Sequence, residues 1–357
     1  MRAITIRPGQ AGSVQVGDIP EPVPGPGQAL LQTLSVGVCG TDREILAGAH
    51  GAAPAGRDVL IPGHECLARV LRAPDGSGLA AGQLVVPTVR RPCGRPECYP
   101  CAHDHPDMCV TLGYTERGIQ GADGYQCERF TEVPRYLVAV PAALGAAAVL
   151  LEPTSVVAKA VEEAARVQRA RLAWEPRAAL VTGAGPVGLL GAMLLRLRGL
   201  DVTVYDRMPA DSFKARAAAA VGARYLCADQ AKLGEGGPFD WILECTGAPP
   251  VVFGSIPALA PCGVLCLLGV SGTEGTLSVP AAAVNRQLVL TNGLLFGSVN
   301  ASREAFTAGA QALAAAQAAW PGWLERLITR RVAPNAVGQA VDLGPEDVKA
   351  VVEWAAA

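Results

Sequence analysis

The sequence predicts an α/β protein with two domains, a β-rich, barrel-like domain followed by a doubly wound parallel sheet. The chain has 357 residues, half of them hydrophobic, which is too long for one ordinary core. Residues 1–150 hold short β-branched runs between glycines and prolines, as barrels do. Beyond residue 150, strand-like and helix-like segments alternate, which is typical of a parallel sheet covered by helices.

Each element follows from its own stretch of sequence. Short strand-like runs in the first domain include 14–16, 29–34 and 84–87. An Ala-rich stretch over 142–172 predicts helix. In the second domain, we expect strands over 177–181, 202–205, 241–244 and 264–268, and helices over 189–198 and 213–221. After about residue 297 the chain is again helical and irregular. We therefore expect three segments, 1–150, 151–297 and 298–357.

Charge and hydropathy exclude two kinds of partner. The net charge is −2 and only 17% of residues are charged, so no basic excess exists to neutralise a phosphate backbone, and we expect no nucleic-acid partner. No uncharged apolar run reaches about 18 residues, so neither a membrane span nor a membrane partner is predicted. The first ten residues lack the apolar core of a signal peptide, and we expect a cytoplasmic protein.

Four of the eleven cysteines lie within residues 93–109, a segment that we name the cysteine lobe. In a reducing cytoplasm such clustering indicates metal binding or reactivity rather than disulfides. Four thiolates can surround Zn²⁺ tetrahedrally, so a structural zinc is predicted on Cys93, Cys98, Cys101 and Cys109. The four-residue gap after the first cysteine, where two residues are usual, leaves open a lobe that holds its shape without metal. We expect Cys66, Cys227, Cys262 and Cys266 in the core.

A Gly-x-Gly-x-x-Gly turn follows the strand predicted at 177–181 and opens a helix, which indicates a dinucleotide site. Gly183 permits the tight turn, Gly185 lets the backbone approach a pyrophosphate, and Gly188 lets helix and strand pack closely. The helix N-terminus then presents free N–H groups to the phosphates. The predicted cofactor-binding residues of this turn are Gly183, Gly185, Pro186, Val187 and Gly188.

The acidic residue that ends the next predicted strand bears on the choice of cofactor. The carboxylate of Asp206 can accept both ribose hydroxyls and would repel a 2′-phosphate, which favours NAD over NADP. Arg207 follows immediately and could bind a 2′-phosphate. NADP therefore stays open as the second cofactor.

A second set of metal ligands is spread through the first domain. Cys39 and Thr41 stand in Cys-Gly-Thr-Asp after one predicted strand, His64 and Glu65 follow another, and Glu152 lies where the helical stretch begins. Together they supply a thiolate, an imidazole and carboxylates, the mixed set of a catalytic zinc with an open position. Zinc there would lower the pKa of a bound alcohol by several units, which makes the alcohol a better hydride donor.

These motifs occur in the same order in zinc-containing medium-chain alcohol dehydrogenases, and the sequence resembles that family over nearly its whole length. It is more similar still to the glucose 1-dehydrogenase branch. The segments that carry this closer resemblance are Cys39–Ile45, Gly51–Gly56, Tyr114–Ile119, Leu151–Val157 and Phe296–Asn300. The resemblance implies a GroES-like catalytic domain over 1–150, a Rossmann domain over 151–297, and a return to the catalytic domain over 298–357.

The resemblance also implies roles for individual residues. It implies that Cys39 and His64 bind the catalytic zinc, with Glu65 and Glu152 in or near its coordination shell. The positions expected to hold sugar hydroxyls are Glu116, Glu152 and Asn300, and Asn300 is also expected near the cofactor. The resemblance places Thr41 near the reacting hydroxyl and the nicotinamide ribose, which suits a proton relay. Members of the family are commonly tetramers and sometimes dimers, so we expect a homo-oligomer.

We therefore predict a zinc-dependent oxidoreductase that moves hydride from a sugar or cyclic polyol hydroxyl to NAD(P)⁺. His50 stands where the branch often has an aromatic residue, at the edge of a loop that could cover the substrate, and this leaves the substrate open. A cyclitol, an aminocyclitol or a sugar-derived intermediate of a specialised pathway would suit the same ligands. A non-catalytic cofactor-binding protein is the alternative of another class, and the presence of both Cys39 and His64 disfavours it.

Overall fold

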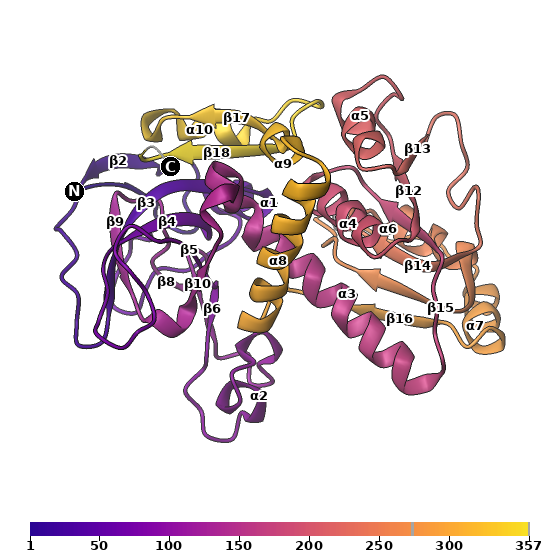
Figure 1. Ribbon diagram of the computed structural model, residues 1–357, viewed down its shortest axis with the longest axis horizontal. Helices are drawn as coiled ribbons and strands as arrows, with labels where there is room; N and C mark the ends of the chain where they lie inside the picture. The colour runs from indigo at the N-terminus through magenta and orange to yellow at the C-terminus, as the bar shows by residue number, and fades with distance from the viewer. Residues whose placement is uncertain (273–274, 356–357) are drawn as a thin grey trace. The chain divides into compact units, whose positions relative to one another are not determined.

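The computed structural model describes residues 1–272 and 275–355, which form two compact units (Figure 1). Unit 1 consists of Met1–Ser155, Asn300–Gln317 and Leu324–Ala357, and unit 2 consists of Val156–Val299 and Ala318–Trp323. The predicted fold class, a β-rich GroES-like part with a doubly wound parallel part, is confirmed.

Unit 1 is built on a seven-stranded sheet in the order β10-β5-β4-β3-β18-β17, with β9 also paired to β3. These strands are β3 (Ala29–Val38), β4 (Glu65–Arg72), β5 (Leu84–Pro87), β9 (Arg129–Glu132), β10 (Leu137–Ala139), β17 (Ile328–Val332) and β18 (Lys349–Glu353). A two-stranded sheet of β1 (Arg2–Thr5) and β2 (Gln15–Asp18) and a three-stranded sheet of β6 (Arg90–Arg91), β7 (Thr115–Arg117) and β8 (Gly121–Ala122) complete it.

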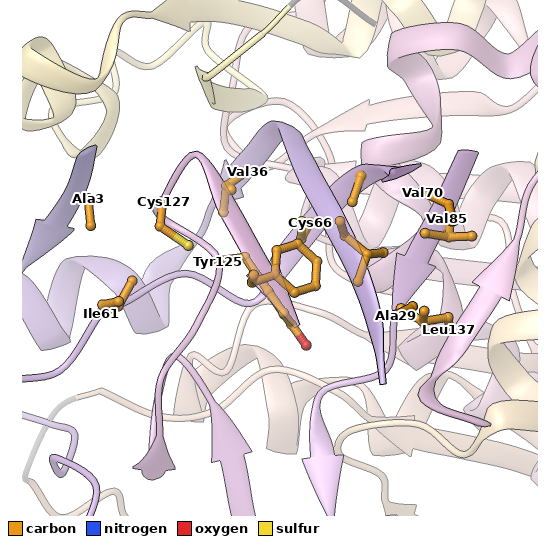
Figure 2. Close-up of a cluster of buried hydrophobic side chains, with 13 residues drawn as sticks. Ala3, Ala29, Val36, Ile61, Cys66, Val70, Val85, Tyr125, Cys127 and Leu137 are labelled. Carbon is orange, nitrogen blue, oxygen red and sulfur yellow. The ribbon is translucent and has the colours of Figure 1, made fainter. Parts of the chain in front are cut away.

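A cluster of buried side chains fills the interior of this unit (Figure 2). Val36 of β3 and Cys66 of β4 contribute to it from neighbouring strands, and both are fully buried. The Tyr125 ring packs against Phe130 with centroids 4.6 Å apart. Cys66 is thus a core thiol, as predicted. Burial of this apolar surface stabilises the strand ends that carry the site described below.

The C-terminal segment corrects the prediction of a helical and irregular ending. Helices α8 (Arg303–Ala319), α9 (Trp323–Leu327) and α10 (Val337–Val341) are present, but β17 and β18 are strands of the unit 1 sheet. β18 pairs antiparallel with β3, with Val352 opposite Val36. Four successive residues of β18 are buried, so no polar–apolar alternation shows in the sequence. Its partner lies about 300 residues earlier, beyond the reach of a local pattern.

Unit 2 is a six-stranded parallel sheet in the order β13-β12-β11-β14-β15-β16, the doubly wound order 3-2-1-4-5-6. The strands are β11 (Ala178–Thr182), β12 (Asp201–Asp206), β13 (Arg224–Cys227), β14 (Phe239–Glu244), β15 (Leu259–Leu267) and β16 (Leu294–Gly297). The helices include α4 (Pro186–Leu197), α5 (Phe213–Ala220), α6 (Pro249–Gly254) and α7 (Ala281–Leu290). Every strand and helix predicted in this part of the chain is present.

The Ala-rich stretch forms η3 (Ala142–Leu150) and α3 (Leu151–Arg171). By length and composition alone it could cross a membrane, but 83% of its most apolar window is buried inside the protein. That degree of burial is typical of a core helix.

Candidate active site

Cys39 and His64 meet because β3 and β4 are antiparallel neighbours. Cys39 follows the end of β3, and His64 precedes the start of β4, so both lie at the same edge of the sheet. Cys39 is the N-cap of α1 (Gly40–Leu46), and its backbone N–H donates to Asp42 Oδ2 at 2.9 Å. Its sulfur lies 3.4 Å from His64 Nε2.

Glu65 reaches this edge because the residue opposite has no side chain. Gly37 of β3 pairs with Glu65 of β4, and a Cβ at Gly37 would lie 2.1 Å from Glu65 Oε2. Any other residue at Gly37 would displace the carboxylate. The ligand atoms of Cys39, His64 and Glu65 lie within 4.8 Å of one another.

The donor set fits zinc. A tetrahedral zinc with Zn–S near 2.3 Å and Zn–N near 2.05 Å separates sulfur from nitrogen by about 3.6 Å, close to the 3.4 Å observed. His64 and Glu65 are buried, whereas Cys39 is only partly buried, which gives the set an accessible side. A thiolate and an imidazole with an accessible position are typical of a catalytic rather than a closed zinc site.

Charge in this cluster favours a bound cation. Burial raises the pKa of the Cys39 thiol and of the Asp42 carboxyl, because both charged forms lose hydration. Burial likewise raises the pKa of Glu152 to about 7, although His64 opposes the shift. Burial disfavours protonated His64, yet Cys39 and Asp42 raise its pKa well above the ordinary value. The cluster is therefore rich in acidic groups that a metal ion would hold in their charged forms.

Lys349 is a member of this cluster that the sequence did not reveal. It begins β18 and is 1% exposed. Its Nζ donates to Glu65 Oε1 at 2.8 Å and to Glu65 Oε2 at 2.7 Å. Both charges are buried, so each depends on the other for compensation. The only sequence signal was an isolated lysine in an apolar run, and it gains meaning only once β18 is known to pair with β3.

Two further predicted residues lie close by. Glu152 is 7% exposed and lies in the first turn of α3. The charges of His64 and Glu65 affect its pKa. Its oxygens do not belong to the group of ligand atoms formed by Cys39, His64 and Glu65. Thr41 is half-buried in the first turn of α1. The roles of both remain predictions. His50, which stands where related proteins often have an aromatic residue, is exposed.

The structure brings together Glu116 and Asn300, which are 184 residues apart. Glu116 lies on β7, and its Oε1 accepts a hydrogen bond from Asn300 Nδ2 at 2.9 Å. Asn300 has φ 59°, in the left-handed region, and its Oδ1 accepts from Ala301 N at 2.8 Å. Arg90 of β6, which sequence reasoning missed, donates to the same Oε1 from Nε at 3.1 Å and from Nη2 at 3.0 Å.

The cysteine lobe brings its four sulfurs together through α2 (Tyr99–Ala102) and η1 (Pro106–Met108), and it extends away from the unit 1 sheet (Figure 1). All four sulfurs lie within 4.8 Å of one another, and all four cysteines are free thiols. Cys98 Sγ and Cys109 Sγ are 3.7 Å apart, and a tetrahedron with Zn–S of 2.3 Å has an edge of about 3.8 Å. The longer gap after Cys93 therefore does not prevent zinc geometry.

Backbone amides in the lobe favour the thiolate of Cys98. Burial would raise the pKa of Cys98, but hydrogen bonds from the backbone of Cys101 and Val110 outweigh it and lower the pKa to about 6. A thiolate is the form that binds zinc. His103 is exposed and stacks on the Tyr99 ring, and it does not belong to the sulfur set.

The glycine turn of unit 2 has the predicted backbone. Gly183 follows β11 with φ +88°, a conformation that glycine adopts without strain. A Cβ at Gly188 would lie 1.8 Å from the Gly183 carbonyl oxygen, so close packing requires glycine there. Gly185 caps α4 in an extended conformation, and Pro186 takes the first helical position. The turn thus presents the N-terminus of a twelve-residue helix, which suits a pyrophosphate.

Asp206 ends β12 beside this turn. Its Oδ2 accepts from Ala184 N at 2.7 Å, and its Oδ1 accepts from Met208 N at 2.8 Å. Tyr225 also interacts with this carboxylate, so a ribose hydroxyl would use the lone pairs that these three donors leave. Arg207 is exposed.

A barrel-like unit with a thiol–imidazole–carboxylate cluster and a doubly wound unit with a dinucleotide turn define an alcohol dehydrogenase type of oxidoreductase. The sequence profile described as "Alcohol dehydrogenase GroES-like domain" matches residues 25–142. The profile described as "Glucose dehydrogenase C-terminus" matches residues 145–354, more than half of the chain.

Glucose dehydrogenases are among the proteins similar to this chain over its full length. A glucose 1-dehydrogenase from Methanocella arvoryzae is 43% identical over 99% of both chains, and one from Thermoproteus tenax is also 43% identical over 99% of both. A solved structure of the Haloferax mediterranei glucose dehydrogenase in complex with NADP, Zn and gluconolactone superposes with a TM-score of 0.90, at 35% identity over the whole of both chains. The chain belongs to the glucose 1-dehydrogenase family, which confirms the predicted resemblance.

Proposed function

We propose that the protein oxidises a sugar hydroxyl, converting D-glucose to its lactone, with NAD(P)⁺ as the hydride acceptor. The observation that carries this proposal is the convergence of Cys39, His64 and Glu65 within 4.8 Å at one sheet edge. The names of the relatives support glucose as the substrate, and the Haloferax mediterranei structure holds gluconolactone, the lactone of an oxidised glucose.

Cys39 and His64 would hold a catalytic zinc, with Glu65 or Glu152 near it. When bound there, zinc supplies an electrophile that lowers the pKa of the reacting hydroxyl. The four cysteines of the lobe would hold a second, structural zinc.

The remaining residues would position the substrate and move its proton. Within the described residues, the hydrogen bonds to the Glu116 side chain all reach Oε1, which leaves Oε2 to accept from a sugar hydroxyl. Glu152, with a pKa of about 7, can accept a proton at neutral pH. Thr41 would relay the proton of the reacting hydroxyl toward solvent. The hydride would pass from the carbon that bears this hydroxyl to the nicotinamide.

For the cofactor, we propose a preference for NAD because Asp206 offers its carboxylate to the ribose hydroxyls. NADP is the second candidate, since Arg207 is exposed beside it and the Haloferax mediterranei structure holds NADP. Asp206→Ala should raise the KM for NAD⁺ about tenfold and leave the KM for NADP⁺ unchanged or lower. An unchanged KM for NAD⁺ would remove Asp206 from the cofactor site.

We also propose a homodimer or homotetramer. β16 is an edge strand of the unit 2 sheet, and exposed apolar side chains surround it, among them Leu290, Leu295 and Val299. Such an edge pairs readily with a second copy. Sedimentation at several protein concentrations would detect the association, and a monomer at all of them would refute it.

The test of the function is a comparison of substrates. Initial rates of NAD⁺ and NADP⁺ reduction would be measured with D-glucose, D-galactose, D-xylose, inositols and simple alcohols. We expect an aldose to give the highest kcat/KM. A preference for an inositol would instead favour the cyclitol alternative, and activity on simple alcohols alone would refute the sugar assignment.

A further inference from the structure

Arg90 is a buried cation that no predicted role accounts for. Its side chain is 6% exposed, and it lies on β6 beside β7, with Arg90 directly opposite Glu116. A buried guanidinium is costly unless its N–H groups are paired. Its contacts divide between two parts of unit 1.

On one side, Arg90 fixes Glu116. Its Nε and Nη2 both donate to Glu116 Oε1, at 3.1 and 3.0 Å, and Asn300 Nδ2 donates to the same oxygen at 2.9 Å. Three N–H donors converge on this oxygen, so the carboxylate cannot rotate without breaking charge-assisted bonds. Its Oε2 is therefore held in one direction.

On the other side, Arg90 is anchored to the cysteine lobe. Its Nη1 donates to the backbone oxygen of Asp107, a lobe residue, at 3.0 Å. The guanidinium lies over the Tyr114 ring, 3.7 Å from the centroid. Tyr114 in turn packs against the buried cysteines of the lobe, Cys98, Cys101 and Cys109.

We propose that Arg90 is a positioning residue that couples the cysteine lobe to sugar recognition by Glu116. This inference rests on the proposed function, since it assigns Glu116 to the sugar. The lobe then does more than stabilise the fold, because its folded state fixes the direction of the carboxylate that reads a substrate hydroxyl.

Arg90→Lys tests the inference. Lysine keeps the charge but cannot bind Glu116 through two N–H groups and also reach Asp107 and Tyr114 in the same geometry. We expect the KM for D-glucose to rise about tenfold, the loss of a charge-assisted hydrogen bond, while kcat and the KM for the cofactor change less than about twofold. Tyr114→Leu should raise the same KM about threefold, and it serves if Arg90→Lys does not fold.

Arg91→Lys is the matched control. Arg91 is the adjacent residue and is also largely buried, but it pairs with Glu132 at 2.6 Å instead of with Glu116. We expect its sugar KM to match that of the wild type, even if its unfolding midpoint falls.

Two results would overturn the inference, and a third bears on the function itself. An unchanged sugar KM in both Arg90→Lys and Tyr114→Leu would remove Arg90 as a positioning residue. An equal rise in Arg91→Lys would show only general loss of structure. If the wild type oxidises no sugar at all, the proposed function fails and this inference falls with it, whereas a wild type active on sugars isolates the role of Arg90.

Discussion

The two cysteine-containing sites of unit 1 are built in opposite ways. The cysteine lobe draws four sulfurs from residues 93–109, and three of its four cysteines are buried. The cluster of Cys39, His64 and Glu65 draws its ligands from the end of β3 and the start of β4, mixes sulfur, nitrogen and oxygen donors, and keeps a thiol that is only partly buried. A closed sulfur set suits a metal that stabilises a loop, and a mixed, accessible set suits one that meets a substrate. The difference predicts that equivalent changes at the two sites have different consequences.

The largest expected effect is on turnover. Cys39→Ser should lower kcat/KM about a thousandfold or more, because metal assistance to the reacting hydroxyl is worth several kcal/mol. Its thermal unfolding midpoint should move by less than about 4 °C, since the residue is only partly buried and serine is of similar size. Steady-state kinetics and calorimetry on one preparation check both. Full activity of this variant without metal would contradict the assignment of the site.

The buried ion pair should give the next largest effect, on stability. Lys349→Met leaves Glu65 charged and uncompensated in the interior, which costs about 3–5 kcal/mol of unfolding free energy. Urea unfolding would measure it. The double variant Lys349→Met/Glu65→Gln removes both charges and should recover most of the loss. If the single and double variants are equally stable, the pair is not the source of the effect.

A substitution in the cysteine lobe should lower stability more than activity, the reverse of Cys39→Ser. Cys109→Ser should release one metal ion per chain and lower the unfolding midpoint by about 5–10 °C, because a metal bound there would be coupled to folding. Its kcat should fall far less than that of Cys39→Ser. Metal analysis and steady-state kinetics check both expectations. A loss of kcat as large as that of Cys39→Ser would contradict a purely structural role for the metal site of the lobe.

The smallest effect concerns pH in the metal-free protein. The pKa of Glu152 rises on folding from its ordinary 4.5 to about 7, chiefly through burial. The folded state then binds the proton more tightly, so the unfolding free energy should fall as pH rises from about 4.5 through 7, by about 3 kcal/mol. Glu152→Gln should flatten this slope. An identical pH dependence in wild type and variant would contradict the buried setting of Glu152.

What the sequence could predict also separates these regions. The glycine turn and the cysteine lobe are each formed by one short segment. Sequence spacing alone therefore predicts the four sulfur ligands of the lobe, and also the tight turn at Gly183 and the close packing at Gly188. Cys39 and His64 were predicted as separate motifs, although their contact depends on the pairing of β3 with β4.

The residues that sequence reasoning missed owe their meaning to long-range pairing. Lys349 meets Glu65 only because β18 joins β3, and Arg90 meets Glu116 only because β6 pairs with β7. Neither lysine nor arginine in those positions has a local pattern that distinguishes it from a surface charge. Tertiary structure, rather than propensity, makes them part of the site.

Zinc-dependent oxidation of a sugar is tested most directly by one measurement. The rate of NAD⁺ or NADP⁺ reduction by D-glucose would be followed in the purified protein, after chelation of its metal, and after zinc is restored. We predict that activity disappears on chelation and returns when zinc is added. The wild type should then bind zinc at the site of Cys39, His64 and Glu65, and Cys39→Ser should not. Undiminished glucose oxidation by the metal-free protein would contradict the account.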